Sequence, residues 1–178
     1  ALRKAPDAAL GVGRLVVMGG TIHGRGNVTP AAEFNIHADP EAAEIVLTAG
    51  LPTVLVPWET CADTRLAGDR VADLFARATD SPRRQFSRAL CDHARGVIRG
   101  FTGKDHFRFV DPLAAAVLID PGVVTASVSA SLRVALAPGL TRGMTVVDPS
   151  GRLGTPRVQV VAGADAERVA ALYAASVA

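Results

Sequence analysis

The sequence contains no long apolar run and no recognisable targeting segment. Its longest uninterrupted apolar stretch, Leu113–Ile119, is far shorter than the roughly 20 residues that a membrane-spanning helix requires. The N-terminus lacks the basic start, apolar core and small-residue cleavage site of a secretory signal. We therefore expect neither a membrane span nor an export signal, and a cytoplasmic location.

Cysteine and net charge are also scarce. The two cysteines, Cys61 and Cys91, show no CxxC or metal-binding spacing, which predicts reduced thiols in a reducing compartment. The 19 basic and 17 acidic residues leave a formal charge of +2, too small to indicate a phosphate-rich partner. The one local basic excess has helical spacing, which favours a solvated helix face over a nucleic-acid patch, and comprises Arg83, Arg84, Arg88, Arg95 and Arg99 around Asp92.

Several common catalytic motifs are absent. The sequence has no GxSxG, Walker loop, HExxH or dinucleotide fingerprint, which disfavours the enzyme classes that depend on them. Gly24-Arg25-Gly26 is too short to cradle a phosphate, and it does not lead from a strand directly into a helix.

The chain does contain the alternation of helices and buried strands that indicates an α/β domain. With 178 residues, of which 49% are hydrophobic, it is long enough for one core, so we expect one domain over residues 1–178. Apolar β-branched runs predict strands, and amphipathic spacing with Asp-Pro starts or Gly ends predicts helices. The expected helices cover 1–10, 39–48, 62–78, 82–99, 111–119 and 164–177, and the expected strands cover 14–18, 53–57, 124–136, 144–147 and 158–161.

The order of these elements predicts an open mixed sheet, mainly parallel and flanked by helices. Alternating apolar and small polar residues after Val124 indicate antiparallel strands beside the parallel ones. The chain opens with a helix rather than with a first strand, which we interpret as the C-terminal portion of a larger open α/β fold.

Three polar residues near a Gly-rich loop, Asn27, Glu33 and Asn35, are candidates for ligand binding. Glu33 and Asn35 alternate on a segment that we predict to be extended, so both side chains would point to one side. That side could be a pocket. On pattern alone a solvated strand edge is the simpler interpretation, and Asn27 also suits an ordinary turn.

Asp111 and the histidines are open to a similar double interpretation. Asp111 precedes Pro112 and has a complete structural explanation as a helix cap, as Asp39 has before Pro40. Among the four histidines, only His23 lies inside the Gly-rich loop, where it could meet a ligand.

A series of short motifs runs through the chain: Leu15–Gly20 (LVVMGG), Gly26–Pro30 (GNVTP), Ala32–Ile36 (AEFNI), Asp39–Ala43 (DPEAA), Val54–Thr60 (VLVPWET), Asp111–Ala114 (DPLA) and Thr141–Asp148 (TRGMTVVD). Together they resemble the inosine-uridine preferring nucleoside hydrolase family, in the family's order. One such motif would mean little, but a series that covers nearly the whole chain is specific.

This resemblance implies hydrolysis of the N-glycosidic bond of ribonucleosides, with a calcium ion at the bottom of the pocket. Departure of the base builds positive charge on the ribosyl ring, so such a site must hold the sugar hydroxyls and activate a water molecule. Calcium takes about six to eight oxygen ligands, which lets it hold carboxylates, water and the ribose diol together. By resemblance, Asp111 is a calcium ligand, Asn35 binds the ribose hydroxyls, Asn27 and Glu33 hold the 5′-hydroxyl, and Met18 lies near a family residue that lines the sugar pocket.

Two departures from the family pattern bear on activity. Val110 stands where well-studied members have the histidine that protonates the leaving base, so no catalytic residue is certain, and His23 and His106 are speculative substitutes. The Asp-rich N-terminal motif, which in the family supplies most calcium ligands and the general base, is absent. We therefore expect weak calcium binding and at best feeble hydrolysis from this chain alone.

The resemblance also sets the expected partners and the expected site. We expect a ribonucleoside substrate, no nucleic acid and no membrane, and either a homo-oligomer or a missing N-terminal part, with an apolar sheet edge that promotes self-association. The side chains of Asn27, Glu33, Asn35 and Asp111 should converge at the carboxyl edge of the sheet. Two rival hypotheses are a catalytically silent remnant that binds a sugar or a partner chain, and a nucleic-acid binder that uses the arginine-bearing helix.

Overall fold

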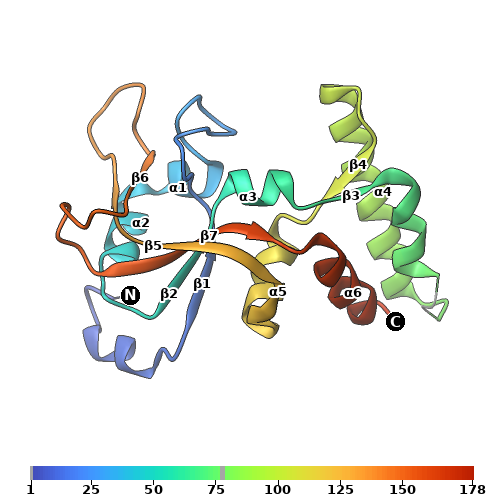
Figure 1. Ribbon diagram of the computed structural model, residues 1–178, viewed down its shortest axis with the longest axis horizontal. Helices are drawn as coiled ribbons and strands as arrows, with labels where there is room; N and C mark the ends of the chain where they lie inside the picture. The colour runs from blue at the N-terminus through green and yellow to red at the C-terminus, as the bar shows by residue number, and fades with distance from the viewer. Residues whose placement is uncertain (1, 77–78) are drawn as a thin grey trace. The chain divides into compact units, whose positions relative to one another are not determined.

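The computed structural model describes residues 2–76 and 79–178, which form two compact units. The sheet unit comprises Ala1–Thr60 and Val124–Gly163, and the helical unit comprises Cys61–Val123 and Ala164–Ala178. The colours of Figure 1 follow the residue number, so the segments of each unit can be traced along the chain. Each unit is therefore built from two stretches that are distant in the sequence.

A sheet of five strands, counted over the described residues, forms the centre of the sheet unit (Figure 1). β1, β2 and β7 are parallel, whereas β5 and β6 are antiparallel. This mixed sheet flanked by helices confirms the predicted fold class. In spatial order the strands are β1 (Leu15–Met18), β2 (Thr53–Val56), β7 (Arg157–Ala164), β5 (Val124–Val134) and β6 (Thr145–Asp148).

The burial of the parallel strands follows from their sequences. β2 is a continuous apolar run after Thr53 and is buried at every position, as expected for a parallel strand covered on both faces. β1 is equally apolar but lies at the end of the strand order and is only half-buried. The predicted self-association through an apolar sheet edge stays a prediction.

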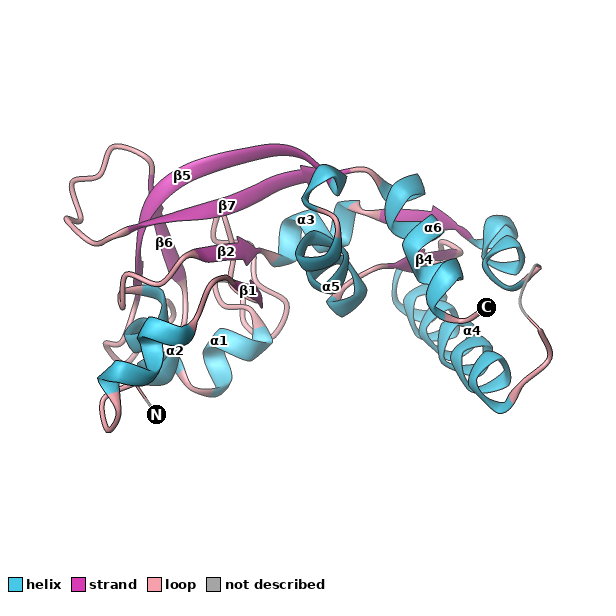
Figure 2. Ribbon diagram, turned by 90° about the horizontal axis from the view of Figure 1, so that it is seen from below, coloured by secondary structure: helices cyan, strands magenta, loops and turns pink. Residues whose placement is uncertain are grey.

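Two short helices, α1 (Phe34–Ala38) and α2 (Pro40–Leu47), cover one face of this sheet (Figure 2). The Asp39 carboxylate accepts a hydrogen bond from the backbone N–H of Ala42 at 2.9 Å, and Pro40 is the first helical residue, which confirms the predicted cap of α2. The apolar side chains that this packing buries include Ile36, Leu47, Leu55, Ala130, Leu132, Val134, Val158 and Val160.

The helical unit packs its elements around an aromatic cluster. Phe107 and Phe109 meet edge to face with ring centroids 5.1 Å apart, and Phe75 meets Tyr173 in the same manner at 6.5 Å. Burial raises the pKa of the Tyr173 hydroxyl. Along the chain the elements are α3 (Trp58–Asp63), which begins in the sheet unit, β3 (Arg65–Ala67), η2 (Gly68–Phe75), α4 (Pro82–Thr102), β4 (His106–Arg108), α5 (Asp111–Ile119), η3 (Pro121–Val123) and α6 (Ala166–Ser176).

Three predicted elements were wrong in part. The helix expected over residues 62–78 is divided into the end of α3, strand β3 and the 3-10 helix η2, because β3 pairs with the distant strand β4; positions 77–78 lie outside the described residues. The helix expected over residues 1–10 is a 3-10 helix, η1 (Pro6–Gly11). The extended piece expected at Glu33–Ile36 is instead the start of α1.

Helix α4 confirms the helix predicted from Pro82 and extends it to Thr102. Its apolar stripe faces solvent, since Phe86, Leu90 and Val97 are 66%, 51% and 45% exposed. Within the described part of the chain, no helix has the length and apolar character needed to cross a bilayer.

Replacement of Leu55 with alanine should lower the free energy of unfolding by about 2–5 kcal/mol, because a fully buried side chain in β2 would be replaced by a cavity. Urea denaturation followed by circular dichroism measures this loss. Val146→Ala on β6 is the matched control, since Val146 is 38% exposed, and it should cost about 1 kcal/mol or less. Equal stability of the Leu55 variant and the wild type would contradict this description of the core.

Candidate functional site

The candidate site is built around the turn that follows strand β1. β1 ends at Met18, and the chain then turns through Gly19 and Gly20, which have φ angles of 156° and 70°. A Cβ on Gly20 would lie only 2.7 Å from a side-chain carbon of Thr145, so the close approach of this turn to strand β6 requires glycine.

Glu33 is the residue that fixes this turn. Its side chain is 2% exposed, and its carboxylate accepts hydrogen bonds from the backbone N–H groups of Gly20 at 3.0 Å, Asn35 at 3.0 Å and Ile36 at 3.3 Å. Glu33 is therefore the N-cap of α1 and at the same time binds the end of β1. The prediction that Glu33 and Asn35 alternate on an extended segment was wrong, because this cap starts a helix at Phe34.

Asn35 presents its side chain to solvent beside the end of β1. Its Nδ2 donates to the Met18 carbonyl oxygen at 3.3 Å and lies 3.2 Å from the Met18 Sδ. The structure thus brings Met18, Glu33 and Asn35 together at the carboxyl end of β1. Their roles in ligand binding stay predictions.

Asn27 joins the same assembly from the Gly-rich loop. Its Oδ1 accepts a hydrogen bond from the backbone N–H of Phe34, at 2.8 Å. Thr29 closes the loop through its Oγ1, which accepts from the N–H of Ala32 at 2.9 Å. Asn27 is therefore held against the start of α1, and its exposed side chain retains its amide N–H donors.

Glu59, on helix α3, organises the rest of the Gly-rich loop. Its carboxylate accepts from the backbone N–H groups of Ile22 at 2.9 Å, His23 at 3.0 Å and Arg25 at 3.4 Å. We did not predict this role from the sequence. Only the position of Glu59 in the VPWET motif, directly after a buried strand, could have suggested that it lies near the site.

A buried pair of threonines fixes the same loop to strand β6. The Oγ1 of Thr145 donates to the Thr21 carbonyl oxygen at 2.6 Å and accepts from the Thr21 N–H at 2.7 Å. Both side chains are almost fully buried, so each polar group needs such a partner. This contact spans 124 residues and was also missed from the sequence.

Asp111 belongs to the helical unit and is the first residue of α5. The expectation that it caps this helix was wrong, because Val110 occupies the N-cap position and no side chain makes a cap hydrogen bond there. Asp111 is exposed, and its carboxylate has no hydrogen bond or ion pair among the residues that the structure describes. The residue before it, Val110, is contacted by Cys61, whose thiol donates to the Val110 carbonyl oxygen at 3.7 Å. The predicted convergence of Asp111 with Asn27, Glu33 and Asn35 stays a prediction.

The two histidines considered as substitutes for a general acid differ in their surroundings. His23 is exposed in the Gly-rich loop. His106 is 6% exposed, and its Nε2 accepts a hydrogen bond from the Nε of Arg108 at 3.2 Å. Burial and then the charges of Arg108 and Arg65 hold the pKa of His106 below its ordinary value, which disfavours it as an acid.

Comparisons with known proteins agree on one family. The sequence model of the inosine-uridine preferring nucleoside hydrolases matches residues 1–171. The chain is 36% identical over 151 residues to the pyrimidine-specific ribonucleoside hydrolase RihA of Citrobacter koseri, which covers 83% of this chain and 46% of that protein. It is 38% identical over 156 residues to the non-specific ribonucleoside hydrolase RihC of Salmonella paratyphi B, which covers 87% of this chain and 48% of that protein.

Solved structures give the same result. The plant nucleoside hydrolase PpNRh1 superposes with a TM-score of 0.86 at 30% identity, over 97% of this chain and 56% of that one. An inosine-guanosine nucleoside hydrolase superposes with a TM-score of 0.82 at 28% identity, over 99% of this chain and 57% of that one. The chain therefore spans about half the length of the relatives that it matches.

Replacement of Glu33 with glutamine should destabilise the fold by about 1–3 kcal/mol, because the new amide NH₂ would face backbone N–H donors that lose their acceptor. Urea denaturation measures the loss, and faster hydrogen exchange at the Gly20 amide locates it. Asp7→Asn, at an exposed carboxylate with no hydrogen bond or ion pair among the described residues, is the control and should change stability by less than about 0.5 kcal/mol. A Glu33 variant with wild-type stability and unchanged exchange at Gly20 would contradict the role of this carboxylate.

Proposed function

Because the chain belongs to the inosine-uridine preferring nucleoside hydrolase family, we propose that it serves the hydrolysis of the N-glycosidic bond of purine or pyrimidine ribonucleosides to ribose and free base. The observation that carries this proposal is the assembly of Met18, Glu33 and Asn35 at the carboxyl end of β1, the edge at which open α/β sheets bind ligands. The cytoplasm is the location that we propose.

The chain's own residues supply the groups that a sugar requires. The exposed Asn35 amide offers its Oδ1 as an acceptor for a ribose hydroxyl, while its Nδ2 is oriented by Met18. The Nδ2 of Asn27 is a second donor, and we assign it to the 5′-hydroxyl. Glu33 is occupied by backbone N–H groups and acts by holding Asn35 and the glycine turn in place. Such fixed polar groups lower the cost of orienting the sugar for reaction.

The described residues do not form a calcium site by themselves. No group of three or more His, Cys, Asp or Glu side chains that could hold a metal ion occurs among them. Calcium takes about six to eight oxygen ligands, and the exposed carboxylate of Asp111 offers at most two. We propose Asp111 as one ligand of a calcium site whose other protein ligands lie outside these residues.

No residue that the structure describes is established as the proton donor to the leaving base. Val110 is apolar, and His106 is buried and donates no proton to solvent or ligand from its Arg108-bound Nε2. His23, which is exposed in the Gly-rich loop, is the candidate that we retain. Its backbone is held by Glu59, so its position relative to the β1 turn is fixed.

A second candidate function is sugar binding without catalysis. The lack of a metal-binding group among the described residues favours it, because the sugar-holding side chains do not depend on such a group. The two functions differ in one measurable quantity, the turnover of a nucleoside.

Base release from inosine and uridine by the purified chain, with excess calcium, should be about 10²-fold or more slower than by RihC assayed in parallel, because the described residues supply no assigned general base and only a proposed acid, His23. Asn35→Ala should weaken ribose binding, whereas Asp111→Ala should leave it unchanged. A turnover equal to that of RihC and abolished by Asp111→Ala would show that the site is complete in this chain. The absence of both nucleoside turnover and ribose binding would contradict the proposed function.

A further inference from the structure

Strands β3 and β4 of the helical unit place two arginines directly opposite each other. The pair is antiparallel, with Arg65 opposite Arg108 and Leu66 opposite Phe107. Side chains alternate between the two faces of a strand pair, and directly opposite residues share one face. Leu66 and Phe107 are buried in the core, so Arg65 and Arg108 lie together on the other face.

His106 completes this face. It lies two residues before Arg108 and opposite Ala67, and therefore on the same side as both arginines. Its Nε2 accepts a hydrogen bond from the Nε of Arg108 at 3.2 Å, which requires that this nitrogen is unprotonated. We name Arg65, His106 and Arg108 the basic face.

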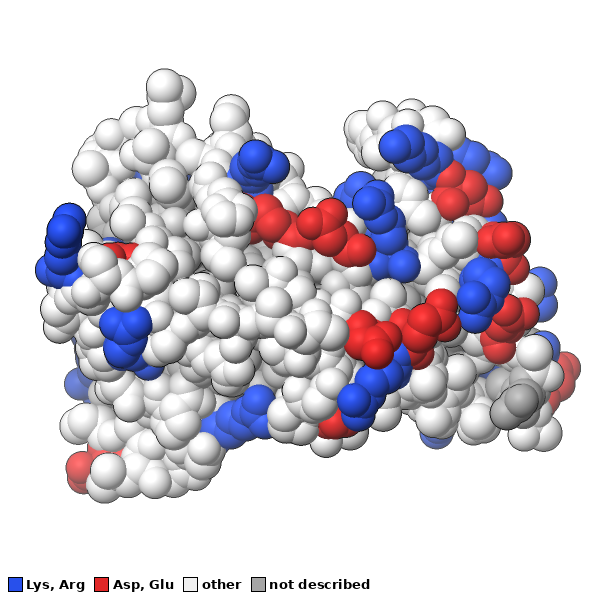
Figure 3. Space-filling view, viewed as in Figure 1, with Lys and Arg blue, Asp and Glu red and all other residues white. Residues whose placement is uncertain are grey.

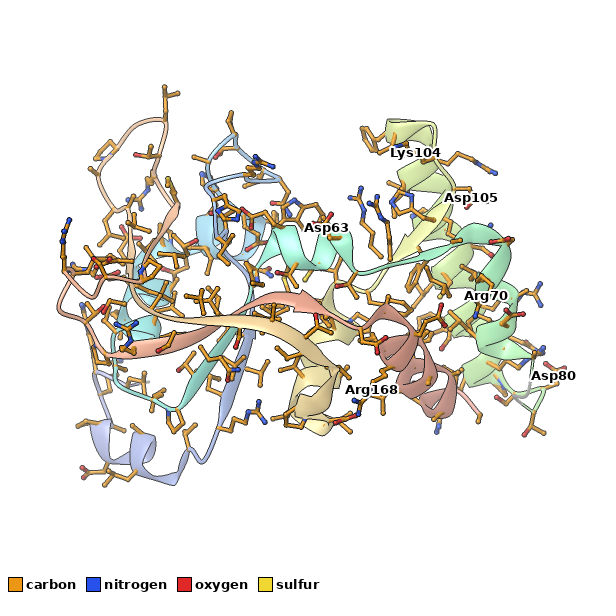
Figure 4. All side chains as sticks on the ribbon, in the orientation of Figure 1. Asp63, Arg70, Asp80, Lys104, Asp105 and Arg168 are labelled. Carbon is orange, nitrogen blue, oxygen red and sulfur yellow. The ribbon has the colours of Figure 1, made fainter. Side chains whose placement is uncertain are left out.

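Arg65 has no acidic partner among the described residues. The Arg65 guanidinium is exposed and makes no hydrogen bond or ion pair within the described ranges. Asp105 lies beside the face (Figure 4), but Arg95 holds it with two hydrogen bonds of 2.7 and 2.9 Å. Asp63, at the end of α3, is exposed and makes no ion pair with any residue that the structure describes. Like charges directly opposite on a strand pair are destabilising, so the arrangement opposes folding.

Further positive charge surrounds the basic face. Lys104 lies two residues before β4 (Figure 4), and Figure 3 shows Lys and Arg atoms over the β3–β4 pair with Asp and Glu atoms next to them. After burial, the charges of Arg108, Arg65 and Lys104 are the strongest influences that lower the pKa of His106, while Asp105 opposes them more weakly. The histidine thus experiences a net positive field.

We propose that the basic face binds a phosphate group, either as inorganic phosphate or as the monoester of a nucleotide. Guanidinium groups match phosphate oxygens in geometry and form charge-assisted hydrogen bonds with them. A phosphate dianion bound between Arg65 and Arg108 would offset the repulsion between their positive charges. Neutral His106 is a positioning residue, since its lone pair holds the Nε of Arg108 and so fixes the plane of that guanidinium. This inference does not depend on the proposed hydrolysis.

The test is phosphate binding by the purified chain at low ionic strength, measured by calorimetry and by the shift in the unfolding temperature Tm. Inorganic phosphate should bind saturably and raise Tm, and Arg65→Gln or Arg108→Gln should weaken binding about tenfold or more. Without phosphate, Arg65→Gln should unfold at the same or a higher temperature than the wild type, because a like-charge pair is removed. Arg152→Gln, an equal loss of charge on an exposed residue of the sheet unit, should bind phosphate as the wild type does.

A titration followed by NMR keeps the proposal testable if an arginine variant does not fold. Phosphate and uridine 5′-monophosphate should shift the resonances of Arg65, His106 and Arg108, whereas uridine should not. Tighter binding of the nucleotide would identify a phosphate monoester as the ligand, and tighter binding of inorganic phosphate would identify the free ion. Binding that is absent, that is the same in the Arg65 variant, or that is equally weakened in the Arg152 control would overturn the proposal, as would a lower Tm of Arg65→Gln without phosphate.

Discussion

The carboxylate of Glu33 is the constraint on which the candidate site in the sheet unit depends. This carboxylate is buried, and hydrogen bonds from the backbone N–H groups of Gly20, Asn35 and Ile36 replace the ones that it would make to water. These bonds connect the end of β1 to the start of α1, two segments that no strand pairing joins. The position of the Asn35 amide beside Met18 follows from this connection.

Short local sequence patterns predicted most of the sheet and several helix starts. The β-branched runs around Val16 and Leu55 gave the strands, and Asp39-Pro40 gave the start of α2, because both signals act within a few residues. Glu33 was missed as a cap because Glu is not among the side chains that usually cap helices. Strand β3 was missed because its partner is 41 residues away at β4, and apolar spacing alone fitted a helix.

The sequence did not predict the contacts that hold the candidate site in place. Family resemblance singled out Met18, Asn27, Glu33 and Asn35, all of which lie around the turn after β1. Glu59 and Thr145 hold that turn from 37 and 124 residues away, and such contacts leave no local pattern. At Asp111 the sequence predicted a contact that the structure does not contain: the Asp-Pro pattern predicted a cap hydrogen bond that the exposed carboxylate does not make. The residues that we propose to bind the sugar are therefore held by several hydrogen bonds, and Asp111 is the proposed metal ligand.

The most direct test of this account is a ribose titration of the isotope-labelled chain, followed by the NMR signals of side-chain and backbone amides. The account predicts saturable shifts of the NMR signals of the Asn35 and Asn27 side-chain amides and of the Gly20 backbone amide. In the Asn35→Ala variant, ribose should no longer shift the Asn27 and Gly20 signals. Both asparagine amides are exposed, so a sugar can reach them without unfolding the loop. Unchanged spectra at high ribose concentration, or shifts only at residues remote from the β1 turn, would contradict the claim that this turn is a sugar-binding site.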